Sequence, residues 1–257
     1  MKGLNFSSLR ARLLLLIILA SMPATVLIIN HAAEERSAAK ARVQADTLQL
    51  THLAVSNQEQ WIEGSRQLLI ALGSLPAVRN RDGAEASEFF AEIHKECPSY
   101  ANIFAATPDG DLFSSAIPLK QPVNSADLTW FKRAVSSRDF AISDYQAVGR
   151  ITGVAVIVAA YPVYDEEGNL QAIVCASLDL TWLNEQPKKM QLPPDTSFRV
   201  IDQNGTILAR HPEPEEWVGQ SLPEEGITKT ILSQHEGTSE APDADNVTRF
   251  FCLCSCP

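Results

Sequence analysis

The sequence predicts an α+β protein that is held by a long N-terminal helix. Three observations lead to this prediction: an apolar run without charges near the start, a long stretch whose apolar residues have helical spacing, and short apolar segments separated by turn motifs after it. The 257 residues are enough for an anchor, one complete domain and part of another. With 45% hydrophobic and 20% charged residues, the composition is that of a folded protein.

The first element is a predicted transmembrane helix at Leu13–Ile29, which contains no charged residue. Its length is at the short end of what crosses a hydrocarbon core about 30 Å thick. Basic residues precede it (Lys2, Arg10 and Arg12) and acidic residues follow it (Glu34 and Glu35). The positive-inside rule therefore places residues 1–12 in the cytoplasm and the rest of the chain outside the bacterial inner membrane, as a single-pass protein with a periplasmic or extracellular body.

A cleaved signal peptide is the alternative interpretation of the same run. A signal peptide ends at a cleavage site with small residues at fixed positions. Ala32 and Ala33 are small, but His31 occupies a position where a small residue is required. We therefore expect the helix to be retained.

Residues 30–75 are predicted to form a long stalk helix. The segment from Ala32 to about Leu75 contains no proline, and its apolar residues lie three, four, seven or eight positions apart, namely Leu50, Leu53, Trp61, Leu68 and Leu72. Such a helix can lie on a core, transmit motion to the membrane, or do both. It would also allow a homodimer, although the segment has no strict heptad repeat.

Pro76 and the polar run Arg79–Gly83 end this helix, and Glu85–Glu96 resumes an amphipathic helical pattern. Ala101–Thr107 and Leu112–Phe113 are then joined by Pro108-Asp109-Gly110, which predicts a β-hairpin.

A short helix at Asp127–Val135 follows, with Asp127 or Ser125 as its N-cap. Three strands come next, at Phe140–Tyr145, Val154–Tyr161 and Leu170–Leu178. The last two are joined by the turn cluster Asp165–Asn169. Strands in meander order beside helices predict an antiparallel sheet.

A second unit begins after a helical connector at Thr181–Lys189, where Pro187, Pro193 and Pro194 are expected to break the chain. Phe198–Asp202 and Thr206–Ala209, joined at Asn204-Gly205, repeat the earlier hairpin. A helix at Thr228–Gln234 and a strand at Val247–Leu253 complete the predicted elements. A sheet begun at Phe198 would lack its closing strands, so the unit is expected to be incomplete.

The charge of the chain disfavours nucleic acid as a partner, and its cysteines do not indicate a disulfide framework. The net charge is −10, which disfavours nucleic acid as a partner because phosphate backbones require clustered Lys and Arg. Of the five cysteines, Cys97 and Cys175 are expected to be buried apolar residues rather than a disulfide. Cys252, Cys254 and Cys256 alternate near the end of the chain, where a spurious tail is the preferred explanation over a metal or redox site.

Several segments together resemble the double Cache sensors, which are extracytoplasmic ligand-binding domains with two PAS-like lobes on a long membrane-connected helix. The resemblance rests on IFAATPDGDLF (Ile103–Phe113), DLTWFKRAV (Asp127–Val135), FAISDY (Phe140–Tyr145) and the segment Gly153–Leu183. It implies a membrane-distal PAS-like lobe at 76–190 and a partial membrane-proximal lobe at 191–257, in which HPEPEEWVGQ resembles the opening of that lobe.

The resemblance also implies that the distal lobe binds a small molecule and signals to a histidine kinase, diguanylate cyclase or chemoreceptor output. Neither an output domain nor a second membrane span is present in the sequence, so we expect a truncated receptor. The ending FFCLCSCP does not resemble the strand of the family, and a frameshift would account for it. A protein-interaction or structural periplasmic domain without a pocket is the alternative function.

In the amino-acid-binding branch of this family, an Arg two positions before a Trp-Tyr pair holds the ligand carboxylate, and an Asp on the last strand holds the ammonium. Trp130 and Asp179 match this pattern, Phe131 lacks the hydroxyl, and Leu128 replaces the Arg. We expect an amine or amino-acid-like ligand, because an unpaired Asp179 would need a cationic partner. The full set of candidate ligand-binding residues is Trp130, Phe131, Arg133, Ser143, Asp144, Tyr145, Tyr161 and Asp179.

Each of these residues also has a structural interpretation. For Trp130 and Tyr161 the alternative is a position in the core, for Asp144 it is the cap of a turn, and for Asp179 it is the cap of the helix that begins near Thr181. The histidines are scattered, and there is no phosphate-binding glycine loop, nucleophile elbow or Walker lysine. We therefore expect no metal site, no cofactor and no enzymatic activity in this chain.

Overall fold

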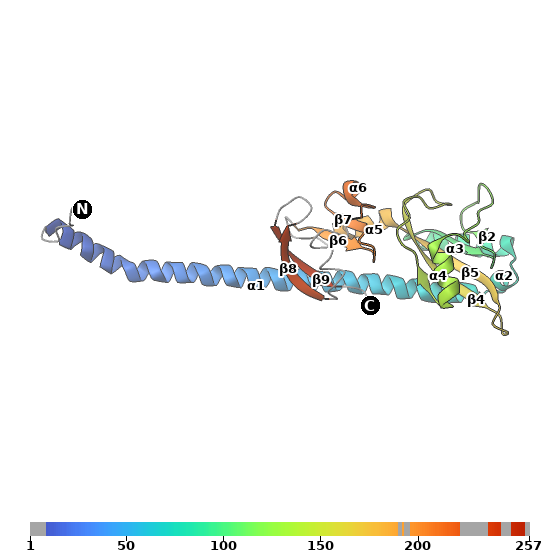
Figure 1. The fold of residues 1–257 in the computed structure, drawn as a ribbon, viewed down its shortest axis with the longest axis horizontal. Coiled ribbons are helices and arrows are strands. Elements are labelled where there is room, and N and C mark those ends of the chain that lie inside the picture. The colour runs from blue at the N-terminus through green and yellow to red at the C-terminus, as the bar shows by residue number, and fades with distance from the viewer. Residues whose placement is uncertain (1–8, 190–191, 193–195, 222–235, 243–247, 255–257) are drawn as a thin grey trace.

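The computed structural model of the chain describes residues 9–189, 192, 196–221, 236–242 and 248–254. Figure 1 shows a long helix, α1, with a mixed helix-and-sheet lobe at its C-terminal end and smaller β-hairpins beside its middle part. The predicted α+β class, with a long N-terminal helix and an antiparallel sheet, is confirmed.

Helix α1 covers Leu9–Gly73, a single helix of 65 residues. The predicted stalk is therefore continuous with the segment predicted to cross the membrane. Within the part of the chain that the structure describes, we find no helix that is long and apolar enough to cross a membrane. Most side chains of Leu13–Ile29 fall outside that part, so the anchor stays a prediction.

The C-terminal end of α1 packs against the sheet. Leu69 and Leu72 are buried there. Gly73 ends the helix beside Val163, whose Cγ2 would lie only 2.7 Å from a Cβ at position 73. The lack of a side chain at Gly73 therefore lets the helix end close to the sheet.

Two helices follow α1. The short helix α2 is formed by Pro76–Arg79, a segment that was predicted only to end the long helix. Helix α3 is formed by Gly83–Glu96, as predicted. Asp82 is its N-cap, and its Oδ1 accepts hydrogen bonds from the N–H groups of Ala84 and Glu85.

The main sheet has five antiparallel strands in the order β2-β1-β5-β4-β3. Their bounds are Tyr100–Ala106 (β1), Leu112–Ser115 (β2), Ala141–Ile142 (β3), Val156–Tyr164 (β4) and Leu170–Asp179 (β5). The predicted hairpins are present, and β3, β4 and β5 are neighbours in the predicted meander order. The pairing of β1 with β5 along Tyr100–Ala106 was not predicted. The prediction missed this pairing because it joins residues about 70 positions apart, for which no local turn is a signal.

The two faces of the sheet carry different apolar clusters, because side chains alternate along each strand. The face toward α1 and α3 includes Leu69, Leu72, Phe90, Ile103, Ala159 and Val163. The opposite face is covered by α4 (Thr129–Ser137) and includes Phe104, Trp130, Phe131, Val158, Ile173 and Cys175. Cys175 is buried and Cys97 is half-buried; both are free, and they pack in the clusters on opposite faces of the sheet.

Two details of this region differ from prediction. Helix α4 has Leu128 at its N-cap and no side-chain capping bond, so neither Asp127 nor Ser125 is the cap. The strand expected at Phe140–Tyr145 is shortened to β3, since the chain turns away after Ile142.

The connector α5 (Leu180–Lys189) leads away from β5 and contains Pro187 within it, so this proline does not break the chain as expected. The repeated hairpin is confirmed as β6 (Phe198–Ile201) and β7 (Ile207–His211), followed by α6 (Pro214–Trp217). A further hairpin joins β8 (Glu236–Pro242) and β9 (Thr248–Cys254) and lies along α1 (Figure 1). The predicted helix at 228–234 lies outside the described residues.

The strands of the second unit form two separate two-stranded sheets among the described residues. The last predicted strand corresponds to β9.

Candidate ligand-binding site

Trp130 lies inside the lobe rather than on an open cleft. Its side chain is 1% exposed and packs edge-on against Phe104 and Phe131, with ring centroids 5.8 Å apart in both pairs. The hollow beside it has a volume of only about 20 Å³, which suits one water molecule. Aromatic side chains therefore fill most of the space beside Trp130 in this structure.

The small hollow beside Trp130 nevertheless has a polar lining. Ser125, Gln146, Arg150, Thr152 and Ser177 contribute to its wall. The indole N–H of Trp130 is buried without a hydrogen-bond acceptor among the described residues. A buried donor without a partner costs about 1–3 kcal/mol, so this is the kind of group that a bound molecule could satisfy.

The segment 146–152 covers this hollow and is held by Arg150. The guanidinium of Arg150 binds both carboxylate oxygens of Asp127, at 3.0 and 2.6 Å, and also donates to the carbonyl of Asn124 at 2.6 Å. The ion pair with Arg150 lowers the pKa of Asp127. Both side chains are exposed, so the pair contributes little to stability.

Two predicted site residues are not beside Trp130. Tyr161 packs with the cluster on the α1 face of the sheet, so it cannot share a pocket with Trp130. Tyr145 packs with Ile157 and Leu180, near the junction with the second unit.

Asp179 has the role of a helix cap in this structure. Its Oδ1 accepts a hydrogen bond of 2.7 Å from the backbone N–H of Thr181, at the start of α5. Asp179 follows Ser177 by two residues on β5, so both side chains are on the sheet face that carries Trp130.

Arg133, Ser143 and Asp144 form one cluster. The Nη1 of Arg133 donates to the carbonyl of Ile142 at 2.6 Å, and its Nη2 lies 3.3 Å from Asp144 Oδ2. The Ser143 hydroxyl donates to the Asp144 carbonyl at 2.7 Å and accepts from the Val158 N–H at 2.8 Å. These bonds hold the end of β3 against α4 and β4.

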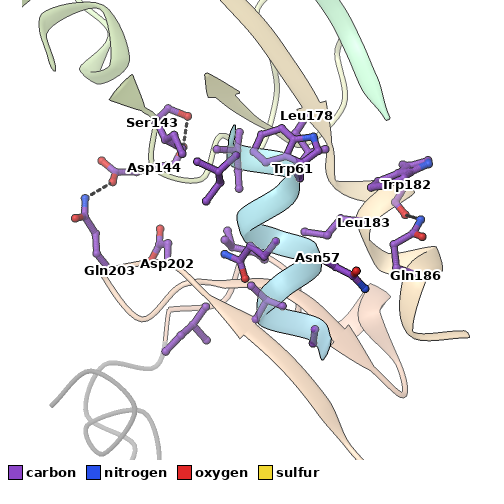
Figure 2. Close-up of a pocket in the computed structure, with 18 of the residues that line it drawn as sticks. Asn57, Trp61, Ser143, Asp144, Leu178, Trp182, Leu183, Gln186, Asp202 and Gln203 are labelled. Carbon is purple, nitrogen blue, oxygen red and sulfur yellow. Dashed lines mark hydrogen bonds between the residues drawn. The ribbon is translucent and has the colours of Figure 1, made fainter. Parts of the chain in front are cut away.

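This cluster lines a much larger cavity, of about 710 Å³. The cavity lies where the main sheet, α1, α5 and the β6–β7 hairpin meet (Figure 2). Its wall includes Trp61 from α1, Leu178 from β5, Leu183 from α5 and Leu208 from β7. The volume is within the range of about 300–1,000 Å³ that is common for ligand pockets.

Only Arg133, Ser143 and Asp144 of this wall were predicted as site residues, and the residues not predicted include Trp61, Trp182, Asp202 and Gln203. Asp202 and Gln203 follow the repeated hairpin's first strand, and Gln203 donates to Asp144 Oδ1 at 2.9 Å. The link joins residues 59 positions apart, and no local pattern could have indicated it.

The described residues contain no group of three or more His, Cys, Asp or Glu side chains that could hold a metal ion. Burial raises the pKa of the Cys175 thiol well above its ordinary value, which makes this side chain an inert part of the core.

The chain resembles known proteins in sequence and in fold. Residues 35–247 match the Cache domain model dCache_1. Sporulation kinase D of Bacillus subtilis (strain 168) is 25% identical over 199 residues, which are 77% of this chain and 38% of that protein. The chain therefore spans less than half of the length of this relative.

Solved structures share the fold at low identity. The extracellular domain of rpHK1S-Z16 has a TM-score of 0.75 and 17% identity, with 83% of this chain and 89% of that chain covered. The ligand-binding domain of the Pseudomonas fluorescens chemoreceptor CtaA, in complex with L-isoleucine, has a TM-score of 0.63 and 18% identity over 84% and 87%. The ligand-binding domain of PctB, an amino acid chemoreceptor of Pseudomonas aeruginosa PAO1, in complex with L-Gln, has a TM-score of 0.60 and 18% identity over 79% and 81%. Since the family model covers most of the sequence and the sheet and long helix have the same arrangement, this chain belongs to the Cache domain family.

Proposed function

We propose that this chain is the small-molecule sensing module of a membrane signalling receptor. The observation that carries the proposal is the match to the Cache domain over residues 35–247, in a fold whose sheet packs directly on a helix of 65 residues. A lobe in contact with a long helix can transmit a change at the lobe to the other end of that helix. A protein-interaction domain without a pocket is less favoured, because the lobe is hollowed at its contact with α1.

The module is proposed to be anchored by Leu13–Ile29 with its N-terminus in the cytoplasm and its acidic body outside. The apolar run and the basic residues before it support this topology. Residues 76–190 would be the membrane-distal lobe and residues 191–257 part of the membrane-proximal lobe. Any kinase, cyclase or chemoreceptor output would belong to a domain other than this one.

The proposed ligand is an amine or an amino-acid-like compound, and its proposed site is the polar hollow beside Trp130. CtaA and PctB were solved with amino acids bound, which supports this class of ligand. The indole N–H of Trp130 without an acceptor, the hydroxyl of Ser177 and the carboxylate of Asp179 on the same sheet face would supply the contacts. Arg150 at the wall of the hollow offers a guanidinium in place of the arginine that is missing at Leu128.

Entry of a ligand requires segment 146–152 to move, because the hollow is now large enough only for a water molecule. The Arg150–Asp127 pair that holds this segment is exposed to solvent, and exposed ion pairs contribute little to stability. The segment can therefore open at small cost.

A thermal-shift screen of the purified full-length chain tests this function. Amino acids, primary amines and organic acids would each be added in excess of their expected dissociation constant. A ligand at about 100 times its Kd stabilises by about 2.7 kcal/mol, which corresponds to a rise in Tm of roughly 5 °C or more.

A matched pair of variants places the ligand. Ser177→Leu would fill the hollow and abolish the shift, whereas Ser136→Leu, on the exposed side of α4, would retain it. Absence of a shift with every compound would overturn the sensing proposal, and a shift that survives Ser177→Leu would overturn the site.

A further inference from the structure

We propose a second binding site in this chain, in the cavity of about 710 Å³ between α1, the main sheet, α5 and the β6–β7 hairpin. Its ligand would be an amphipathic molecule with an apolar or aromatic body and a primary amine at one end. The site is separate from the hollow beside Trp130, and it does not depend on a ligand being bound there.

The cavity is built from segments that are distant in sequence. Asn57 and Trp61 come from α1, Ser143 and Leu178 from the distal sheet region, and Trp182 from α5 (Figure 2). Hairpin β6–β7 closes it with Phe198, Val200, Ile201 and Leu208. An occupant would therefore contact the long helix and both units at the same time.

Much of the wall is apolar and aromatic. Ile157, Leu178 and Leu208 are at most 7% exposed. Trp61 and Trp182 add two indole rings, which suit an aromatic or aliphatic body.

The two carboxylates of the wall lie on one side of the cavity. Figure 2 shows Asp144 and Asp202 on this polar side with Ser143 and Gln203, while the opposite side carries Trp182 and Leu183 together with the amide of Gln186. An occupant with one cationic end matches this distribution of charge.

The charges on the polar side favour a cationic end. Asp144 is already paired with Arg133 and accepts a hydrogen bond from Gln203. Asp202 Oδ1 accepts the N–H groups of Asn204 and Thr206, at 2.9 and 2.8 Å.

The second oxygen, Asp202 Oδ2, is buried with no donor among the described residues. Because Asp202 lines the cavity, a charged donor such as an ammonium group that binds there would satisfy this oxygen most effectively once the side chain turns toward it. Lys189 is the other cation that lines the cavity, and it is exposed to solvent.

Occupancy would influence α1 directly. A ligand shifts a conformational equilibrium only through unequal affinity for the two states. Because the wall consists of α1, the sheet and the β6–β7 hairpin, any movement of one against the others changes the cavity and hence the affinity. An apolar amine would therefore favour the arrangement of α1 and the two units that encloses it.

Isothermal titration calorimetry on the full-length chain tests the site with three probes that share one body. Phenethylamine carries the ammonium, 2-phenylethanol a neutral hydroxyl and phenylacetate a carboxylate. Phenethylamine is expected to bind at least tenfold more tightly than either of the others. Equal or tighter binding of phenylacetate would overturn the proposal.

Two variants and two controls locate the binding. Ala54→Phe, on the α1 wall, would fill the cavity and weaken phenethylamine at least tenfold, while Ser56→Phe on the exposed side of α1 would not. Asp202→Asn keeps the acceptor for the turn and removes the charge, so it would abolish the preference for the amine over the alcohol.

Ser177→Leu fills the hollow beside Trp130 and so removes only binding in that hollow, while the binding component that is sensitive to Ala54→Phe would remain. This control distinguishes failure of the second site from failure of the proposed site beside Trp130. Loss of binding in Ser177→Leu, or unchanged binding in both Ala54→Phe and Asp202→Asn, would refute the second site.

Discussion

Arg133 on α4 is joined to Asp144, eleven positions later, by an ion pair of 3.3 Å between Nη2 and Oδ2. The same guanidinium donates to the carbonyl of Ile142 at 2.6 Å. The Arg133 side chain thus links α4 to the segment that follows β3. The Asp144 carboxylate also accepts a hydrogen bond from Gln203 of the second unit. The three residues form a polar bridge between the two units.

Arg133→Ala should destabilise the chain by roughly 1–2 kcal/mol, because it removes a charge-assisted hydrogen bond and a partly buried ion pair. Urea denaturation at neutral pH measures this change. Lys132→Ala, an exposed neighbour on the same helix, is the control and should have little effect. Arg133→Lys should restore only part of the stability, since one ammonium replaces a planar fork that reaches both partners. Equal effects of the changes at 132 and 133 would contradict this role.

Segment 146–152, which covers the hollow beside Trp130, should be held less firmly in acid. The hydrogen bond from Arg150 lowers the pKa of Asp127 below its ordinary value of 3.8. The contribution of this pair is therefore complete above the ordinary value and is lost as the pH falls through the lowered one.

Hydrogen exchange can follow this change at Gly149 and Gly153, whose N–H groups are bonded within the cover. Their protection, corrected for the intrinsic pH dependence of exchange, should fall in acid. Asp127→Asn should have low protection at neutral pH already and show no further decrease in acid. The same pH dependence in that variant would show that another group is responsible.

Gly219 and Tyr145 should be energetically coupled. Gly219 has φ of +88°, and a Cβ at this position would collide with the Tyr145 hydroxyl. Gly219→Ala should therefore cost about 1–3 kcal/mol through backbone strain and the collision together.

Gly153→Ala provides the matched control, because Gly153 has φ of +72° and nothing within 4 Å of its added Cβ. The Gly153→Ala variant should lose only the stability that the strained backbone costs. Tyr145→Phe should relieve part of the cost of Gly219→Ala, with a coupling of at least about 0.5 kcal/mol in a double-mutant cycle. Strict additivity would mean that the two residues are not in contact in solution.

Ser65 and Tyr100 should also be coupled, since they link α1 to β1. Their hydroxyl oxygens are 2.8 Å apart and buried, and burial raises the pKa of Tyr100. Ser65→Ala would leave the Tyr100 hydroxyl without this partner and should destabilise by about 1–3 kcal/mol. Adding Tyr100→Phe should cost less in the Ser65→Ala background than in the native one. Urea denaturation of the four proteins measures the difference.

The local elements could be predicted from the sequence because their signals are local. Pro108-Asp109-Gly110 and Asn204-Gly205 mark turns by residue type alone, and both hairpins are present. The pairing of β1 with β5 could not be predicted in this way, since neither strand carries a mark of its distant partner.

The site was predicted less well, for a related reason. The sequence pattern singled out Trp130 and Asp179, but it could not distinguish a pocket wall from a packed core or a ligand contact from a helix cap. Arg133, Ser143 and Asp144 do line a cavity, although its other walls come from α1 and from β6–β7. A cavity whose walls come from segments distant in sequence appears only when those segments are assembled.

The unbroken run of α1 from Leu9 to Gly73 has a geometric consequence. A rod of 65 residues is about 100 Å long, and each residue turns it by about 100°. Inserting a single residue into α1 before the part that contacts β9 would rotate the N-terminal end relative to the lobes by more than a quarter turn. Seven added residues would return the two ends almost to their original azimuth. The rotational position of the N-terminal end of α1 about the helix axis can thus be changed by altering the length of the helix, while every contact of the lobes stays intact.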